Sequence, residues 1–492
     1  MAAICAVDIG TTRIKAMTFG EDMAPGGTVS APSVLNTPLP GVVEIDADAL
    51  WNQTLAVLQD LQSIAPPVDA VVITNQRATV FVVDEAGNAF GPGLCWEDSR
   101  GSEELASWVD SVGREHFTST TGLVPSTIWS LAKILWLCRH GLPAGARFAT
   151  VQDWLLRRLG APDWILDHAN ASLVGLLNLH SLQWDADLTQ LAGLSTAQLP
   201  ALSPSAVRVG GISNDIAAAT GLPAGLPLIL GGGDQQCASL GLGVLHPGIV
   251  GVNLGTAGVV NVPADRLLID PHGSLVTLAH VVPGRWILEG LAKTYGGAHR
   301  WGCGILNDEL VNLAAQAPIG SHGLLCLPYF AGGGAPEYDS TLHGALLGLT
   351  LANGRADIAR AVLEGTTVEL VRILDAARTF IETNRIIVSG GGARSRLLLE
   401  MLANLAGVSV AVAPQSETSL IGAALLAWVG LGRWPDIAAA STVLPSPSEV
   451  LVPDPKLMEA YRSVYRCYRS ALNDLCRVGV LSLSCTQQAD ER

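Results

Sequence analysis

Short apolar runs recur along the chain, and each of them leads into a segment rich in glycine or polar residues. The runs are rich in β-branched residues and are too short for helices, so the pattern predicts buried strands. We expect the main strands at residues 4–7, 70–73, 80–83, 227–230, 251–254, 385–388 and 408–412.

Longer stretches with apolar residues three and four positions apart separate these runs and predict helices. Asp46 is the expected N-cap of the first helix, and Gly407 is the expected C-terminal stop of a later one. The main helices are expected at residues 44–61, 130–137, 289–301, 357–378 and 397–405. Strands that alternate with helices are typical of an α/β fold.

One pattern, a strand, a Gly-Thr turn and a second strand, occurs twice, about 245 residues apart. The first turn, Gly10-Thr11-Thr12-Arg13, follows Asp8, and the second contains Gly255-Thr256. Neither is a Walker A loop, but backbone N–H groups and hydroxyls at such turns can bind phosphate. The two copies suggest a duplicated architecture with facing domains, and a chance likeness of two Gly-Thr turns is the alternative. The expected domains are residues 1–243 and 244–450, followed by a C-terminal helix and polar tail over 451–492.

Length, composition and charge limit the classes of function that this chain can have. The length of 492 residues predicts two or three domains, and 49% hydrophobic with 15% charged residues is typical of large buried cores. The net charge of -15 argues against nucleic acid or an anionic membrane as a partner. Nine scattered cysteines without a C-x-x-C pair predict free thiols, and no histidine spacing indicates zinc. With no signal peptide or membrane-spanning run, we expect a cytoplasmic protein.

The candidate chemistry lies at strand ends. Asp234 and Gln235 follow three glycines at the end of the strand at 227–230, where an open α/β sheet binds its ligands. The alternative is a glycine turn with a solvated aspartate. Gln76, Arg77 and Trp96 also follow strands and suit a polyol, since amide and guanidinium groups bind hydroxyls and an indole packs on C–H groups. Core packing of the indole and a surface ion pair of the guanidinium are the alternatives.

Five ordered segments resemble the FGGY family of carbohydrate kinases, whose fold has two actin-like (ribonuclease H-like) domains with ATP in the cleft between them. The match runs over nearly the whole length. The segments are Asp8-Ile-Gly-Thr-Thr12, Ser130-Leu-Ala-Lys133 to His140, Leu254-Gly-Thr-Ala-Gly258, Gly344 to Glu364, and Ser389-Gly-Gly-Gly-Ala-Arg-Ser395.

The resemblance implies roles for these residues. Asp234 is the expected catalytic base, and Asp8 and Asp234 are expected near Mg²⁺. The residues implied at the sugar or polyol are Gln76, Arg77, Trp96, Asp234 and Gln235. The residues implied at ATP are Asp8, Gly10, Thr11, Thr12, Arg13, Gly255, Thr256, Gly391, Gly392 and Ala393. The partner is then a small molecule rather than nucleic acid or a membrane, and a homodimer is left open.

The substrate is predicted from the positions at which this sequence departs from the pattern of known family members. Asn75-Gln76-Arg77 and Gly233-Asp234-Gln235-Gln236 look like glycerol kinases, but Ala78 stands where those enzymes carry an acid that binds glycerol hydroxyls. A small residue there opens space, so we predict a ketopentose phosphorylated at its terminal hydroxyl, with D-xylulose first. Glycerol or another polyol is the alternative, and an actin-like ATPase without a sugar substrate is the alternative from another class.

Overall fold

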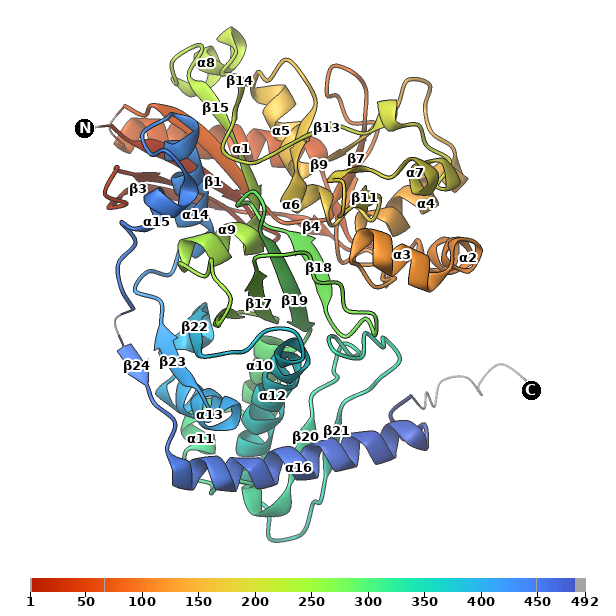
Figure 1. Cartoon of the computed structure of the whole chain (residues 1–492), viewed down its shortest axis with the longest axis vertical. Coiled ribbons are helices and arrows are strands. Elements are labelled where there is room, and N and C mark those ends of the chain that lie inside the picture. The colour runs from red at the N-terminus through yellow and green to blue at the C-terminus, as the bar shows by residue number, and fades with distance from the viewer. Residues whose placement is uncertain (1, 66, 448, 483–492) are drawn as a thin grey trace.

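The computed structural model describes residues 2–65, 67–447 and 449–482. The polar tail predicted after Cys485 lies outside these residues. Figure 1 shows two halves, each built around a large sheet, with the chain passing from the upper half to the lower half near its middle.

The first sheet has six strands in the order β14-β15-β6-β1-β2-β3. Strand β1 runs antiparallel to β2 and parallel to β6, and β15 is parallel to β6. The strands are β1 (Ile4–Ile9), β2 (Arg13–Phe19), β3 (Pro25–Pro32), β6 (Ala70–Asn75), β14 (Arg208–Gly211) and β15 (Pro227–Gly233).

The second sheet has seven strands in the order β18-β19-β17-β16-β22-β23-β24. The run β19-β17-β16-β22-β23 repeats β3-β2-β1-β6-β15 in order and direction, which confirms the predicted two actin-like α/β units. The strands are β16 (Ile249–Leu254), β17 (Gly258–Ala264), β18 (Val276–Ala279), β19 (Trp286–Ala292), β22 (Arg385–Ser389), β23 (Ser409–Val412) and β24 (Glu449–Leu451).

Helices cover both faces of the first sheet, which explains its nearly continuous apolar strands. Cys5, Val7 and Ile9 of β1 pack in one core with α1 (Ala47–Ile64), whereas Ile4 and Ala6 pack in another with α14 (Thr418–Gly430). Helix α14 therefore comes from late in the sequence but lies on the first sheet. In Figure 1 it is blue and lies beside the red strand β1.

A smaller third sheet and several helices complete the upper half. The sheet has the order β4-β5-β8-β7-β9. Its strands are β4 (Leu35–Asn36), β5 (Glu44–Ile45), β7 (Val80–Val83), β8 (Gly93–Leu94) and β9 (Arg147–Thr150). The nearby helices are α2 (Ser102–Val112), α3 (Arg114–Thr121), α4 (Ser130–His140), α5 (Val151–Leu159) and α8 (Asn214–Thr220).

In the lower half, helices surround the second sheet. They are α10 (Tyr295–Leu306), α12 (Arg355–Arg378), α13 (Arg396–Ala406) and the long α16 (Pro455–Arg477), which runs along the lower edge in Figure 1. Gly407 ends α13 in the left-handed conformation, as predicted. No helix among the described residues is long and apolar enough to cross a membrane.

Three sequence-based expectations were wrong in detail. The helix expected at 289–301 is strand β19 followed by α10, because its first four residues continue an apolar strand run. The first helix begins at Ala47, after Asp46, whose carboxylate accepts from the N–H of Ala49 at 2.8 Å. The three glycines before Asp234 belong to β15 instead of forming a turn.

Candidate active site

Asp234 is the first residue of α9 (Asp234–Gly241), at the end of β15. The glycines before it are required by packing: a Cβ on Gly231 would lie 2.0 Å from the carbonyl oxygen of Ile73, and one on Gly233 would lie 2.6 Å from the Arg77 side chain. Gly231 and Gly233 therefore allow the neighbouring strand and the Arg77 side chain to lie close to β15. The Asp234 side chain stays 28% exposed, so it can reach a substrate.

Arg77 lies two residues after the end of β6 and contacts Asp234, with its Nε 3.2 Å from Oδ1. Its two terminal nitrogens donate to Glu289 at 2.8 and 3.0 Å, in a two-bond arrangement. Its Nη1 also lies 3.3 Å from Oε1 of Gln236. The expectation of a surface ion pair does not hold, because the Arg77 side chain is only 14% exposed and that of Glu289 only 6%.

Glu289 comes from β19 in the second sheet, so the Arg77–Glu289 pair joins the two halves of the molecule next to Asp234. Burial raises the pKa of Asp234, and the neighbouring Arg77 charge works in the opposite direction. The N–H of Gln235 also donates to Asp234 Oδ1 at 2.8 Å. Oδ1 is thus held by two donors, which leaves Oδ2 as the oxygen to accept a proton.

Asp8 lies near the end of β1, and its Oδ2 accepts a hydrogen bond from Ser419 of α14 at 2.7 Å. Lys15, opposite Asp8 in β2, forms an ion pair with Glu417 at 2.7 Å. Burial, and next the charge of Asp234, raise the pKa of Asp8 to about 7. Two carboxylates close enough to repel each other are disfavoured unless a proton or a cation neutralises one of them.

These two carboxylates fit a divalent cation. Asp8 Oδ1 is buried and has no hydrogen-bond partner, which is the arrangement expected where a ligand supplies the missing contact. Oxygen ligands of this kind suit Mg²⁺, which is commonly held by one or two carboxylates together with substrate phosphates.

The predicted substrate and phosphate residues of the first half are connected. Trp96 Nε1 donates to Thr11 Oγ1 at 3.0 Å, and Thr11 donates in turn to Gln76 Oε1 at 3.0 Å. The indole is partly exposed, so simple core packing does not describe it. Because the Thr11 hydroxyl is used within the protein, its backbone is the better candidate for a phosphate.

The rest of the first turn is open to solvent. Thr12 and Arg13 are exposed, and Arg13 Nη2 donates to Ser30 on β3 at 2.6 Å. The N–H of Gly10 closes the turn on the carbonyl of Arg13 at 3.0 Å. The structure thus brings Thr11, Gln76 and Trp96 together and directs the Arg13 side chain toward the neighbouring strand β3.

The second turn joins β16 and β17 and is supported by α10. The N–H groups of Gly296 and Gly297 donate to the carbonyls of Gly255 and Thr256 at 3.2 and 3.0 Å. Thr256 itself is exposed at the tip. This leaves its hydroxyl accessible to a nucleotide.

The predicted adenosine segment lies against this second turn. Residues 391–394 form a short 3₁₀ helix after β22, and a Cβ on Gly392 would lie 2.8 Å from the Leu254 side chain. Gly390 has φ 85°, and a Cβ there would meet the carbonyl of Leu254 at 2.8 Å. Only glycine fits this position. Gly390 and Gly392 therefore lie beside Leu254, which precedes Gly255, although more than 130 residues separate them in the sequence. Gly391 and Ala393 belong to the same short helix.

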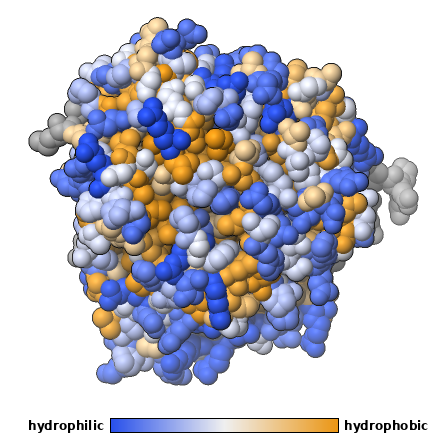
Figure 2. Space-filling view, turned by 45° about the horizontal axis from the view of Figure 1, so that its top comes forward, coloured by the Kyte–Doolittle hydropathy of each residue, from blue (hydrophilic) through white to orange (hydrophobic). Residues whose placement is uncertain are grey.

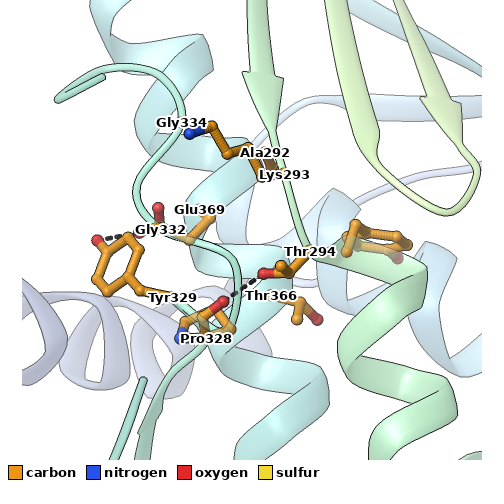
Figure 3. A pocket seen from close by; sticks show the side chains of 10 residues that line it. Ala292, Lys293, Thr294, Pro328, Tyr329, Gly332, Gly334, Thr366 and Glu369 are labelled. Carbon is orange, nitrogen blue, oxygen red and sulfur yellow. Dashed lines mark hydrogen bonds between the residues drawn. The ribbon is translucent and has the colours of Figure 1, made fainter. Parts of the chain in front are cut away.

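A pocket of about 260 Å³, open to solvent, lies between the end of β19, α10, α12 and the loop after β20 (Leu325–Leu327). Figure 3 shows Thr294 directed at the carbonyl of Pro328, and Tyr329 donating to Glu369 at 3.1 Å. Lys293 is the one cation among its ten lining residues, and burial lowers its pKa. Its position after β19 places it near the second turn, whose Gly258 pairs with Ala292.

Several buried polar atoms around Asp234 have no partner in the described part of the chain. They are Gln76 Nε2, Gln235 Oε1 and Gln236 Nε2, in addition to Asp8 Oδ1. Unpaired buried groups are costly, and a cluster of them indicates a site that a polar ligand or ordered water completes.

The family follows from comparison with known domains. The FGGY carbohydrate kinase N-terminal domain matches residues 3–241, and the C-terminal domain of the same family matches residues 250–431. The chain belongs to the FGGY family of carbohydrate kinases. FGGY kinases use ATP, so in this FGGY kinase the two turns are the natural candidates for the phosphates.

Relatives of this FGGY kinase differ in their substrates. A glycerol kinase from Gloeobacter violaceus is 35% identical over 456 residues, covering 89% of this chain and 90% of that protein. A xylulose kinase from Rhodospirillum rubrum is 29% identical, with a TM-score of 0.88 and coverage of 97% and 99%. A xylulose kinase from Lactobacillus acidophilus has a TM-score of 0.92 at 22% identity, again covering 97% and 99%, and supports the fold.

Residues that the sequence did not single out complete the site of this FGGY kinase. Glu289 was expected in a helix but lies in strand β19. A single acid within the apolar run Trp286–Ala292 could have marked it as a candidate site residue. Ser419 and Glu417 reach Asp8 and Lys15 from over 400 residues away, and no local pattern marks them. Helix α14, which carries Ser419, begins at Thr418.

Proposed function

We propose that this FGGY kinase transfers the γ-phosphoryl group of ATP to the terminal hydroxyl of a small open-chain polyol or polyhydroxy ketone. The observation that carries the proposal is Asp234, a partly exposed carboxylate at a strand exit, held by Arg77 and the Gln235 N–H and accompanied by unpaired buried amides. A filament or chaperone ATPase of the same fold has no need of a base and hydroxyl-binding groups at this place.

In this proposal Asp234 Oδ2 accepts the proton of the acceptor hydroxyl as its oxygen attacks the γ-phosphorus. Burial raises the pKa of Asp234, which makes it a better base than an exposed aspartate. Arg77 orients the carboxylate, and Gln76, Gln235 and Arg77 provide polar contacts for the acceptor. Asp8 and Asp234 would hold Mg²⁺, which neutralises phosphate charge when bound.

Glycerol is the first acceptor to test. The glycerol kinase of G. violaceus is 35% identical over most of both chains, and this supports glycerol more strongly than our sequence-based preference for D-xylulose. The Gly233-Asp234-Gln235-Gln236 segment points the same way. Glycerol also matches the unpaired amides near Asp234, because it carries three hydroxyls.

D-xylulose remains the second candidate because of Ala78. Ala78 follows Arg77 directly, is 5% exposed and has φ 62°, so the chain turns there and carries no acid to bind glycerol hydroxyls. A longer acceptor would present further hydroxyls to Arg77 and Gln235, and the xylulose kinase of R. rubrum shares the fold over 97% of this chain.

An ADP-release assay with glycerol, D-xylulose, D- and L-ribulose and erythritol tests the proposal. Each acceptor is compared with a background that contains ATP and Mg²⁺ alone. We expect at least one acceptor to raise the rate well above background, with glycerol giving the highest kcat/KM. A highest value for D-xylulose would favour the second candidate. ATP turnover that no acceptor raises would contradict the proposal.

A further inference from the structure

Lys133 is a buried lysine that the account of the site has not yet used. It lies in the first turn of α4, within the segment Ser130 to His140 that resembles the family, and it is 1% exposed. Lysine is almost never fully buried unless its ammonium group is fully bonded. The contacts of this ammonium therefore indicate what it does.

The Lys133 ammonium binds main-chain carbonyls of two separate loops. One of these loops follows β8, and there the ammonium donates to the carbonyl of Trp96 at 3.1 Å. The other is the segment before α4, where the ammonium donates to three carbonyls. They belong to Thr127, to Ile128 (2.9 Å) and to Trp129 (3.3 Å). The ammonium therefore joins the loop after β8 to the segment that leads into α4.

A carboxylate does not explain the position of this charge. Asp98 is the nearby acid, but its oxygens accept from Arg100 at 2.8 to 3.1 Å and from the N–H of Val43 at 2.9 Å. A cation at the N-terminal end of a helix is also disfavoured by the helix dipole. An apolar residue of similar length would be the simpler choice for stability alone.

Trp96, whose carbonyl accepts from Lys133, is also held through its side chain. Trp96 Nε1 donates to Thr11 Oγ1, and Thr11 donates to Gln76. The backbone contact with Lys133 and the indole contact with Thr11 together leave Trp96 little freedom. Loss of the first contact would release the loop that carries the indole.

We propose that Lys133 is a positioning residue for the acceptor side of the site: its ammonium ties the Trp96 loop to the start of α4 and so sets where the indole lies. The kinetic consequence rests on the function proposed above, whereas the structural consequence does not. The two can therefore be tested separately.

Hydrogen exchange tests the structural part on the full chain without any substrate. Lys133→Met removes the ammonium and keeps the length of the side chain, and we expect the peptide covering residues 93–100 to exchange about tenfold faster. The control is Ile134→Ala, in the same helix and only 1% exposed, which loses packing but leaves the hydrogen bond from Lys133 to the Trp96 carbonyl in place. If both variants exchange alike over 93–100, the proposal is wrong. Lys133→Gln serves if the methionine variant does not fold, with the same expectation.

Kinetics with the best acceptor test the consequence for the site. Lys133→Met should raise the acceptor KM about tenfold while kcat and the KM for ATP change less than about twofold, and Ile134→Ala should leave all three near wild type. In a Trp96→Ala background the same substitution should have no further effect on the acceptor KM. Additive effects would overturn the role through Trp96. Faster exchange in a chain that no acceptor stimulates would instead contradict the proposed function and leave Lys133 as an anchor of this loop.

Discussion

At the residue scale, the site depends on carboxylates whose partners come from distant parts of the chain. Asp8, Arg77 and Asp234 could be predicted because each follows an apolar run that ends in polar residues. Glu289 and Ser419 could not, since the sheets and α14 bring them into contact only in the folded protein. Their roles depend on tertiary packing, which local patterns do not record.

Glu289→Gln is expected to impair acceptor binding. The amide keeps the shape but replaces one of the two charged contacts with Arg77 by a repelling N–H group, so the guanidinium should move toward Asp234. We expect the acceptor KM to rise about tenfold or more. The control is Glu364→Gln, which breaks another buried ion pair, with Arg360, away from the site. An equal KM change in both variants would contradict the positioning of Arg77 by Glu289.

Asp153 predicts how stability varies with pH. It caps α5, and burial raises its pKa to about 7, above the usual 3.8. The unfolded chain therefore loses this proton first, and folding stability falls as pH rises from about 4 to about 7. The reference is Asp153→Asn, which cannot ionise but keeps an oxygen for Thr150. Relative to this variant, the free energy of unfolding of the wild type should fall by at most ~4 kcal/mol over this pH range. Denaturant unfolding of both proteins at several pH values measures this change. A difference in free energy of unfolding that stays constant with pH would contradict the prediction.

At the element scale, both Gly-Thr turns and the strands β1, β6, β15, β16, β22 and β23 could be predicted from alternating apolar and glycine-rich segments. The strands β3, β14, β18, β19 and β24 were not predicted. The failure at 289–301 has a physical cause, because an apolar run in β19 continues almost directly into the apolar face of α10. Periodicity alone does not separate a short buried strand from a buried helix. The junction matters for the proposed function, since the first turn of α10 supports the second Gly-Thr turn.

Gly296→Ala is expected to weaken ATP binding. A Cβ at Gly296 would lie 2.4 Å from the carbonyl oxygen of Gly255, so the second turn would have to move. We expect the KM for ATP to rise about tenfold, with a smaller change for the acceptor. The matched control is Gly304→Ala in the same helix, where a Cβ meets nothing within 4 Å and helix propensity should add up to ~1 kcal/mol of stability. Unchanged ATP kinetics in Gly296→Ala would show that the turn does not bind the nucleotide.

At the scale of the whole molecule, the duplicated sheet order could be predicted from two similar turns, but the exchange of elements between halves could not. Helix α14 packs on the first sheet, and Glu289 of the second sheet reaches Arg77. Figure 2 shows hydrophobic patches near the middle of one face, interspersed with hydrophilic residues that are dense along its lower edge.

Gly422→Ala tests how closely the late helix supports the site. A Cβ at Gly422 in α14 would lie 1.9 Å from the carbonyl oxygen of Cys237 in α9, the helix that begins with Asp234. We expect a loss of roughly 1–3 kcal/mol in stability together with a lower kcat, because α9 must shift. Gly354→Ala, where a Cβ meets nothing within 4 Å, is the control. Thermal unfolding and steady-state kinetics measure both effects, and a stable, fully active Gly422→Ala would be inconsistent with this packing.

The most direct test of the central claim is the turnover of Asp234→Asn with the best acceptor. The asparagine oxygen can keep both contacts of Oδ1, to Arg77 and the Gln235 N–H, while the base is removed. The account predicts a folded protein that binds the acceptor as wild type does, with kcat lower by roughly 10²–10⁴. A kcat within about tenfold of wild type would contradict Asp234 as the group that accepts the proton.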